Sequence, residues 1–333
     1  MGAGTELLPE LLAGLRVVAL PMRERFRGLT VRETALLHGP AGWSEFAAFT
    51  EYPDAEAAHW LAAAVEWAWT AQPAPPLRDA VPVNATVPSV SPAEVPAVLA
   101  RFPGCTTAKV KVAQPGQTLE DDVARVAAVR SAMGPAARIR VDANGAWSVP
   151  EAERATLALR PYGLDYIEQP CASVPELAAL RRRLAGSGLR IAADESVRRA
   201  EDPLAVARAG AADVLVVKAA PLGGVRRALA IVAEAGLPAT VSSALESSVG
   251  LAAGVALAAA LPAGADGTIP AAGLGTAALF AADIVSPALL PREGALPARR
   301  TEPDPALLER WAAAPERTAW WRARIERCAE LLA

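Results

Sequence analysis

Short aliphatic runs, each ending in a charged residue, recur along the middle of this 333-residue chain. Four successive runs end in Asp142, Glu168, Asp194 and Lys218, which are separated by 26, 26 and 24 residues. That interval is close to the length of one strand and the helix that follows it. Evenly spaced charges at strand ends are typical of a (β/α) barrel, whose active site lies at the carboxyl ends of its strands.

The same pattern predicts eight parallel strands with alanine-rich helices between them. We place these strands near residues 82–86, 106–112, 138–143, 164–168, 190–194, 213–218, 238–242 and 267–269. Runs such as Val214–Val217 are aliphatic throughout, as expected of a strand that is buried on both faces. The predicted fold class is therefore α/β, with a (β/α)8-type barrel formed by residues 81–299.

Residues 1–80 lack this alternation and predict a smaller α+β domain. Short strands and turns are expected at Leu15–Pro21, Gly28–Gly39 and Gly42–Phe49, and an amphipathic helix at Ala55–Ala71. A proline-rich joint that begins at Gln72 ends this domain. The tail, residues 300–333, has helical patterns at 306–311 and 320–332, and we expect it to pack beside the N-terminal domain.

Composition and charge exclude several classes of function. The net charge is −3 with both signs interspersed, which gives no basic surface for nucleic acid. No apolar run approaches the roughly 18 residues of a membrane span, and Glu6 and Glu10 argue against a secretory signal. Three dispersed cysteines without a CxxC spacing favour the cytoplasm. We expect a small-molecule partner, and leave the oligomeric state open, a monomer included.

The charged residues at the strand ends are the candidates for chemistry. Because side chains alternate along a strand, Lys109 and Lys111 share one face of theirs, as do Arg140, Asp142 and Asn144. Three carboxylates and three lysines at one barrel mouth must neutralise one another or bind an ion. A network of ion pairs at solvated strand ends is the simpler alternative. Charges in register over consecutive strands favour catalysis instead.

The scarcity of histidine restricts the choice of metal and of base. His38 and His59 both lie upstream of the barrel, so Asp142, Glu168 and Asp194 are the expected metal ligands. Three oxygen ligands favour Mg²⁺, with Mn²⁺ as a substitute. A lysine that is neutral at the working pH would remove the α-proton of a substrate carboxylate, while the metal stabilises the resulting enediolate.

This set of residues resembles the enolase superfamily, in its muconate-lactonizing subgroup. That subgroup carries Lys-x-Lys on the second strand, an acidic metal ligand on each of the third, fourth and fifth strands, and a lysine on the sixth. The matching residues are Lys109, Lys111, Asp142, Glu168, Asp194 and Lys218. Gly42-Trp-Ser-Glu45 is similar to the Gly-Trp-Gly-Glu stretch of the capping domain, with Ser44 as a departure. The resemblance implies a modified barrel with an N-terminal α+β capping domain.

Three further stretches resemble the members of this subgroup that dehydrate a cyclohexadiene dicarboxylate to an aromatic product in menaquinone biosynthesis. They are Val81–Thr86, Arg140–Asn144 and Ser242–Gly250. This resemblance implies that Lys111 acts as base and then as acid. It implies that Lys218 stabilises the enediolate from the opposite face of the ring and that Lys109 supports charge balance.

Other residues receive smaller roles. Ser242, Ser243, Gly223 and Asn144 are expected to contact the substrate, and Arg140 and Glu195 are expected to support the metal ligands. Residues 242–250 offer either a helix N-terminus for the succinyl carboxylate or an ordinary capped turn. Gly223 suits either a backbone approach to substrate or a tight turn. The basic run at residues 23–27 lies either near the anionic substrate or in a solvated loop.

Several alternative functions remain open on the sequence alone. Dipeptide epimerases have Asp-x-Asp on the eighth strand, and Asp266-Gly-Thr-Ile does not supply it. N-succinylamino acid racemase and muconate cycloisomerase need the same two lysines and stay as alternatives. A Schiff-base aldolase using Lys218 would leave three carboxylates without a purpose. A non-catalytic barrel would be favoured by a missing motif residue, and none is missing.

Overall fold

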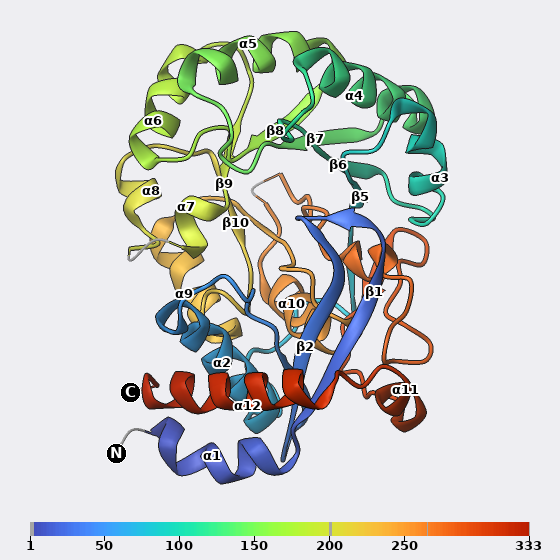
Figure 1. Ribbon diagram of the computed structural model, residues 1–333. Helices are drawn as coiled ribbons and strands as arrows, with labels where there is room; N and C mark the ends of the chain where they lie inside the picture. Colours follow the sequence, from blue (N-terminus) through green and yellow to red (C-terminus); the bar gives the residue numbers. More distant parts are fainter. Residues whose placement is uncertain (1–2, 200–201, 265, 333) are drawn as a thin grey trace.

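A curved sheet of seven parallel strands forms the centre of the barrel in the computed structural model, which describes residues 3–199, 202–264 and 266–332 (Figure 1). Its hydrogen-bonded order is β11-β10-β9-β8-β7-β6-β5. The strands are β5 (Ala85–Val87), β6 (Thr107–Lys111), β7 (Arg138–Asp142), β8 (Leu164–Glu168), β9 (Ile191–Ala193), β10 (Val214–Val217) and β11 (Ala239–Val241). The predicted α/β barrel class is confirmed, and β6 to β11 lie where the aliphatic runs placed them.

The prediction of an eighth strand near residues 267–269 is wrong. Those residues form a turn and irregular backbone. The ring closes instead through isolated parallel bridges of Ser242 with Gly273 and of Val83 with Ala272. A side chain at position 273 would place its Cβ 2.6 Å from Ser242 Oγ, so this close approach requires glycine. The closing segment is thus too short and too glycine-rich to produce a strand pattern.

Another pair of short strands lies at the base of the barrel. β4 (Ala80–Pro82) pairs antiparallel with β12 (Ala295–Pro297). The single strand expected at 82–86 is therefore divided, because its first part turns away to β12 and only its second part joins the sheet.

Helices cover the outside of the sheet, with α3 to α6 forming an arc around β5 to β8 (Figure 1). They are α3 (Val95–Leu99), α4 (Leu119–Met133), α5 (Val149–Leu159), α6 (Val174–Arg183), α7 (Glu195–Arg198), α8 (Ala205–Arg208), α9 (Val225–Ala235) and α10 (Ser248–Ala260), with the 3-10 turns η1 (Pro92–Glu94), η2 (Arg160–Tyr162) and η3 (Gly275–Leu279). Capping boxes at Thr118 and Ser173 begin α4 and α6. None of the described helices combines the length and apolar composition that a membrane crossing needs.

The N-terminal part of the chain forms a three-stranded antiparallel sheet with two helices. Its elements are α1 (Ala3–Ala13), β1 (Arg16–Phe26), β2 (Leu29–Gly39), β3 (Gly42–Phe46) and α2 (Asp54–Trp69). The sequence pattern did not predict α1, which contains Pro9 in its interior. Burial of Leu11 in the core shows that tertiary packing stabilises this helix against the local preference.

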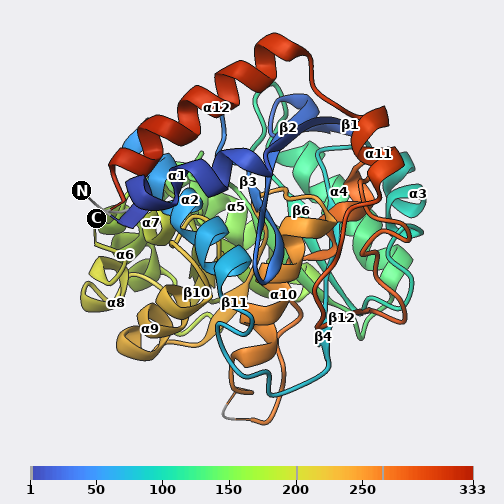
Figure 2. The same ribbon diagram turned by 90° about the horizontal axis from the view of Figure 1, so that it is seen from below.

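The C-terminal segment supplies α11 (Pro305–Arg310) and α12 (Pro315–Glu330). Figure 2 shows α12 running across the same side of the molecule as α1 and α2. Arg324 of α12, which is buried, donates to the carbonyls of Phe49 and Tyr52 at 3.0 and 2.7 Å. The tail thereby braces the loop between β3 and α2.

Two glutamates of the N-terminal sheet and helix α2 bind the starts of two barrel helices. Glu45 accepts hydrogen bonds from the amides of Ser247 and Gly250, each at 3.1 Å, at the start of α10. Glu66 of α2 accepts from the amides of Val225 and Arg226 at 2.5 and 3.2 Å, at the start of α9. Carboxylates are stabilised at helix N-termini because the first amides have no partner within the helix. These contacts fix the capping domain over the barrel.

Replacing Glu45 by alanine should therefore weaken the fold. The buried amides at the start of α10 would lose their acceptor, and we expect a loss of about 2 kcal/mol in the free energy of unfolding. Urea denaturation measures this loss. Glu51→Ala is the matched control, because the Glu51 side chain is 58% exposed and its loss should cost under about 0.5 kcal/mol. Equal losses in the two variants would contradict the assigned role of Glu45.

Candidate active site

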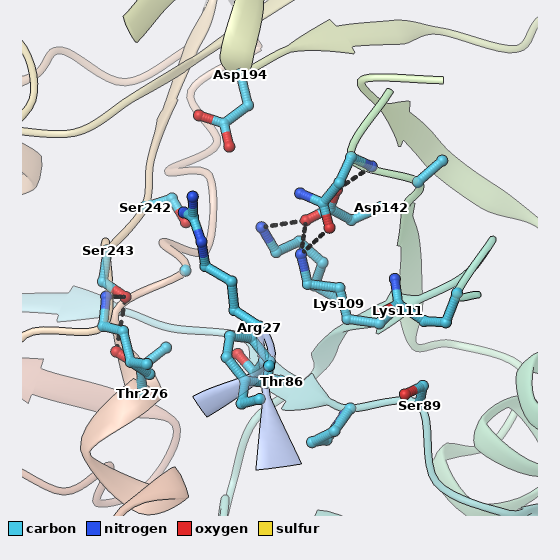
Figure 3. A pocket seen from close by; sticks show the side chains of 18 of the residues that line it. Arg27, Thr86, Ser89, Lys109, Lys111, Asp142, Asp194, Ser242, Ser243 and Thr276 are labelled. Atoms are coloured by element: carbon cyan, nitrogen blue, oxygen red, sulfur yellow. Dashed lines mark hydrogen bonds and ion pairs between the residues drawn. The ribbon is translucent and has the colours of Figure 1, made fainter. Parts of the chain in front are cut away.

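A cavity of about 780 Å³ lies at the carboxyl ends of the barrel strands, beneath the turn between β1 and β2 (Figure 3). The barrel residues that line it include Lys109, Lys111, Asp142, Asn144, Asp194, Glu195, Lys218, Ser242 and Ser243. The capping domain contributes Phe26, Arg27 and Gly28. The strand register thus brings charged residues from the ends of β6, β7, β9 and β10 to a single cavity, while Glu168 of β8 is buried behind them and does not line it.

One half of the site is built on β6, β7 and β8. Lys109 Nζ lies 2.7 Å from Glu168 Oε1 and 3.3 Å from Asp142 Oδ2, so it bridges the two carboxylates. Lys111 Nζ lies 2.6 Å from Asp142 Oδ2 and 2.7 Å from Asn144 Oδ1. Asp142 and Glu168 are almost completely buried. The two lysines of the Lys-x-Lys pair therefore point into the mouth together.

The other half is built on β9, α7 and β10. Lys218 Nζ lies 2.7 Å from Asp194 Oδ2, and Arg198 Nε donates to Asp194 Oδ1 at 2.9 Å. A second guanidinium nitrogen of Arg198 lies 2.7 Å from Glu195 Oε1. Asn144 Nδ2 donates to the same Glu195 oxygen at 3.2 Å, which joins the two halves of the site.

Burial and neighbouring charges displace the pKa values of these groups in different directions. Burial and the carboxylates of Asp142 and Asp194 raise the pKa of Glu168 to about 7, against the effect of Lys109. Burial also favours protonation of Asp194, but Arg198 and Lys218 outweigh it and lower its pKa to about 2. Burial lowers the pKa of Lys218, with Arg198 adding to the effect and Asp194 opposing it. The carboxylate of Glu168 therefore lacks enough neighbouring positive charge to offset its burial.

The carboxylates and cations that pair at the strand ends are equal in number among the described residues. Four carboxylates face four cations, namely Asp142, Glu168, Asp194 and Glu195 against Lys109, Lys111, Lys218 and Arg198. Over residues 3–199, 202–264 and 266–332, no group of three or more acidic, histidine or cysteine side chains is clustered closely enough to hold a metal ion as it stands. The lysine ammonium groups occupy the positions beside the carboxylate oxygens.

Backbone strain concentrates at the same mouth. Five of the six described non-glycine residues with positive φ lie at the strand ends or the rim of the cavity: Arg27, Ala113, Asn144, Gln169 and Leu245. Left-handed backbone is unfavourable for residues with a side chain and persists where the surrounding structure imposes it, often at functional sites. The strain thus marks the mouth independently of its charges.

The remaining predicted site residues take several positions. Ser242 and Ser243 line the cavity, and Ser243 Oγ lies 2.7 Å from Thr276 Oγ1. Arg140 lies lower in the barrel, where Nε donates to Asp165 Oδ2 at 2.9 Å and the guanidinium carbon lies 4.7 Å from the Tyr166 ring centroid. It contacts none of the three predicted metal ligands directly through the hydrogen bonds found among the described residues.

One expected substrate contact, Gly223, requires correction, and the structure favours the capped-turn interpretation of residues 242–250. Gly223 does not line the cavity; it ends the turn that precedes α9, and a Cβ there would lie 3.2 Å from Arg227 of that helix. The tight-turn interpretation accounts for it. The start of α10 does not offer its amides to a ligand either, because Glu45 binds those of Ser247 and Gly250 and Asp283 accepts from the amide of Ser248.

Sequence reasoning missed two polar residues that organise the site. Arg198 holds Asp194 and Glu195, and its Nη1 donates to Tyr52 Oη at 3.0 Å. Gln169 follows Glu168 directly; its Oε1 accepts from the amides of Asp194 and Ser196 at 3.0 and 3.2 Å. The spacing of Asp194 and Arg198 by four residues was the available signal for Arg198. Gln169 carried no signal beyond its place after a strand end.

This combination of barrel, cap and carboxylate–lysine mouth has counterparts among known proteins. Residues 95–302 match the enolase C-terminal domain-like family and residues 17–68 match the enolase N-terminal domain-like family. The chain belongs to the enolase superfamily.

The curated relatives are more specific. The chain is 57% identical over 330 residues to a protein named o-succinylbenzoate synthase from Mycobacterium ulcerans, covering 99% of this chain and 97% of the relative. It is 56% identical over 326 residues to the protein of the same name from Mycobacterium tuberculosis strain H37Rv, covering 98% and 96%. These relatives span the capping domain as well as the barrel.

Solved structures match the fold. The muconate lactonizing enzyme from Pseudomonas fluorescens, in complex with muconolactone, has a TM-score of 0.74 at 24% identity, over 90% of this chain and 98% of that one. A dipeptide epimerase from Enterococcus faecalis has a TM-score of 0.70 at 21% identity, over 87% and 96%. At these identities the likeness concerns the fold alone.

Proposed function

We propose that this chain is an o-succinylbenzoate synthase, a lyase that converts 2-succinyl-6-hydroxy-2,4-cyclohexadiene-1-carboxylate into 2-succinylbenzoate and water. The observation that carries the proposal is the arrangement of Lys111, Asp142, Asp194 and Lys218 around one cavity, with Glu168 buried directly behind Lys109. The identity of 56–57% to relatives of that name, over nearly the whole chain, supports the choice of reaction.

The residues present fit a divalent metal. Glu168 Oε2 is buried and has no hydrogen-bond partner among the described residues, which is costly for a carboxylate unless a cation is bound. Asp142, Glu168 and Asp194 offer oxygen only, the donor that Mg²⁺ prefers, with Mn²⁺ as a substitute. When bound, the dication supplies positive charge for the oxygens of the substrate carboxylate.

The charge balance of the site supports the binding of a divalent metal together with a dicarboxylate substrate. With Lys111 neutral as the base, the other three cations leave one negative charge of the four carboxylates uncompensated. A dication, together with Arg27 on the capping side of the cavity, turns this into an excess of two positive charges. A substrate with two carboxylates restores neutrality. The site is therefore suited to a metal and a dicarboxylate bound together.

The lysines then divide the reaction between them. Lys111, in its neutral form, takes the proton from the ring carbon that bears the carboxylate, and the electron pair moves onto the carboxylate oxygens. Lys111 next returns that proton to the departing hydroxide on the neighbouring carbon, so that water leaves and the ring becomes aromatic. Lys218 supplies positive charge to the carboxylate oxygens. Lys109 holds Glu168 and Asp142 in place.

The experiment is an assay of the purified protein on the cyclohexadiene substrate with Mg²⁺. We expect rapid loss of the diene absorbance, formation of 2-succinylbenzoate, and loss of at least about 10³-fold in rate after chelation, restored by added Mg²⁺. Absence of turnover with Mg²⁺ would rule out the proposed reaction. N-succinylamino acid racemase and muconate cycloisomerase activities would then be assayed on the same protein.

A further inference from the structure

The turn between β1 and β2 places a strained arginine at the rim of the cavity. β1 and β2 pair up to Phe26 and Leu29, so Arg27 and Gly28 alone form the turn. Both have positive φ, 51° and 77°. Two-residue hairpin turns of this kind favour Asn, Asp or Gly at the first position. Arginine is thus unfavourable for the turn itself, and a strained position of this kind is a reason to look for a role of the side chain.

The side chain of Arg27 is oriented by two aromatic residues. Its guanidinium carbon lies 3.7 Å from the ring centroid of Phe49, and Nη2 donates to Tyr52 Oη at 2.7 Å. Glu51, the acidic neighbour, is 3.3 Å away, but its side chain is 58% exposed and the pair is weak in water. Arg27 is therefore held in position by neutral groups that leave most of its charge uncompensated.

The four cations that pair with the carboxylates at the strand ends differ in this respect. Lys109, Lys111, Lys218 and Arg198 each contact a buried carboxylate of the barrel. Arg27 instead lies on the capping side of the same cavity, and Figure 3 shows it reaching from the hairpin toward the side of the barrel that bears Asp194 and Ser242. A planar guanidinium in this position suits a carboxylate, which it binds through two parallel hydrogen bonds.

We propose that Arg27 binds the second carboxylate of the substrate, at the end of the succinyl side chain, and thereby selects dicarboxylates. This inference rests on the proposed function. The phenol of Tyr52 also accepts from Arg198, which holds Asp194. Arg27 and a predicted metal ligand are therefore tied to one rigid group, which sets the distance between the two carboxylate sites. The start of α10, the other candidate for this carboxylate, is occupied by Glu45.

The test is a thermodynamic cycle on binding, in which one change is made in the protein and the other in the ligand. Titration calorimetry with Mg²⁺ compares 2-succinylbenzoate with 2-butanoylbenzoate, in which a methyl group replaces the distal carboxylate. We expect the wild-type protein to bind the dicarboxylate roughly 10- to 100-fold more tightly, as for a hydrogen bond between charged groups. Arg27→Asn should reduce this preference to under about threefold. Asparagine suits the turn, so the midpoint of thermal unfolding should stay within about 2 °C.

Arg23→Asn is the matched control, because Arg23 lies on β1, the strand that leads into the turn, is exposed and does not line the cavity. It should keep the wild-type preference. If Arg27→Asn discriminates between the two ligands as well as the wild type does, the inference is overturned while turnover by the wild type still supports the proposed function. If the wild type neither binds 2-succinylbenzoate nor turns over the cyclohexadiene, the proposed function fails and this inference with it.

Discussion

Lys111→Ala should reduce kcat by about 10⁴-fold while leaving the protein folded and able to bind Mg²⁺. The loss is large because the variant has no group to take the α-proton or to return it to the departing hydroxide. Lys111 Nζ now lies 2.6 Å from Asp142, so its removal also frees that carboxylate for the metal. Mg²⁺ affinity, measured by titration calorimetry, should therefore stay the same or rise.

Lys111→Arg distinguishes a proton carrier from a simple counter-ion. Arginine keeps the positive charge beside Asp142, but it stays protonated at any working pH and does not act as a base. We expect this variant to be as inactive as Lys111→Ala. Gln114→Ala is the control within the cavity and should retain activity to within about threefold. Substantial activity in Lys111→Arg would show that Lys111 only balances charge.

Asp194→Asn and Glu168→Gln should both abolish Mg²⁺ binding at millimolar concentrations, yet differ in their effect on the metal-free fold. Arg198 and Lys218 lower the pKa of Asp194 from 3.8 to about 2. Its negative charge therefore stabilises the fold above pH 3.8, and this stabilisation is lost as the pH falls toward 2. Burial raises the pKa of Glu168 to about 7, so its negative charge is unfavourable to the fold at higher pH. A neutral amide therefore removes a favourable charge in one case and an unfavourable one in the other.

The expected magnitudes follow from these signs. Asp194→Asn leaves two buried cations with less compensation and should cost about 3 kcal/mol in the free energy of unfolding. Glu168→Gln should cost under about 1 kcal/mol at pH 8. Urea denaturation with a chelator present measures both. Equal costs, or a larger cost for Glu168→Gln, would contradict the assigned electrostatics of the site.

The periodic part of this architecture was accessible from the sequence. Parallel strands are buried on both faces, so they appear as aliphatic runs, and the charge that ends each run lies at the mouth. That relation located Asp142, Glu168, Asp194 and Lys218 together with their strands. It also located Lys109 and Lys111, since residues two apart on a strand share a face.

The remaining features depend on contacts between distant segments. The ring closes through Gly273, which has no side chain and therefore lets Ser242 pack closely against its backbone. The periodicity of the sequence does not predict this close contact. Arg198 reaches Asp194 only because α7 begins directly after β9. Glu45 was noticed as part of a motif, but its binding to the start of α10 joins residues that are 202 and 205 positions apart. Such contacts follow from the packing of the domains and not from local pattern.

A crystal structure of the protein with Mg²⁺ and 2-succinylbenzoate tests the central claim most directly. The account predicts one metal ion bound by Asp142, Glu168 and Asp194, with the ring carboxylate on the metal, Lys111 and Lys218 on opposite sides of the ring, and Arg27 at the succinyl carboxylate. A metal bound elsewhere, or a product bound outside the cavity while the lysines keep their present contacts with the carboxylates, would contradict it.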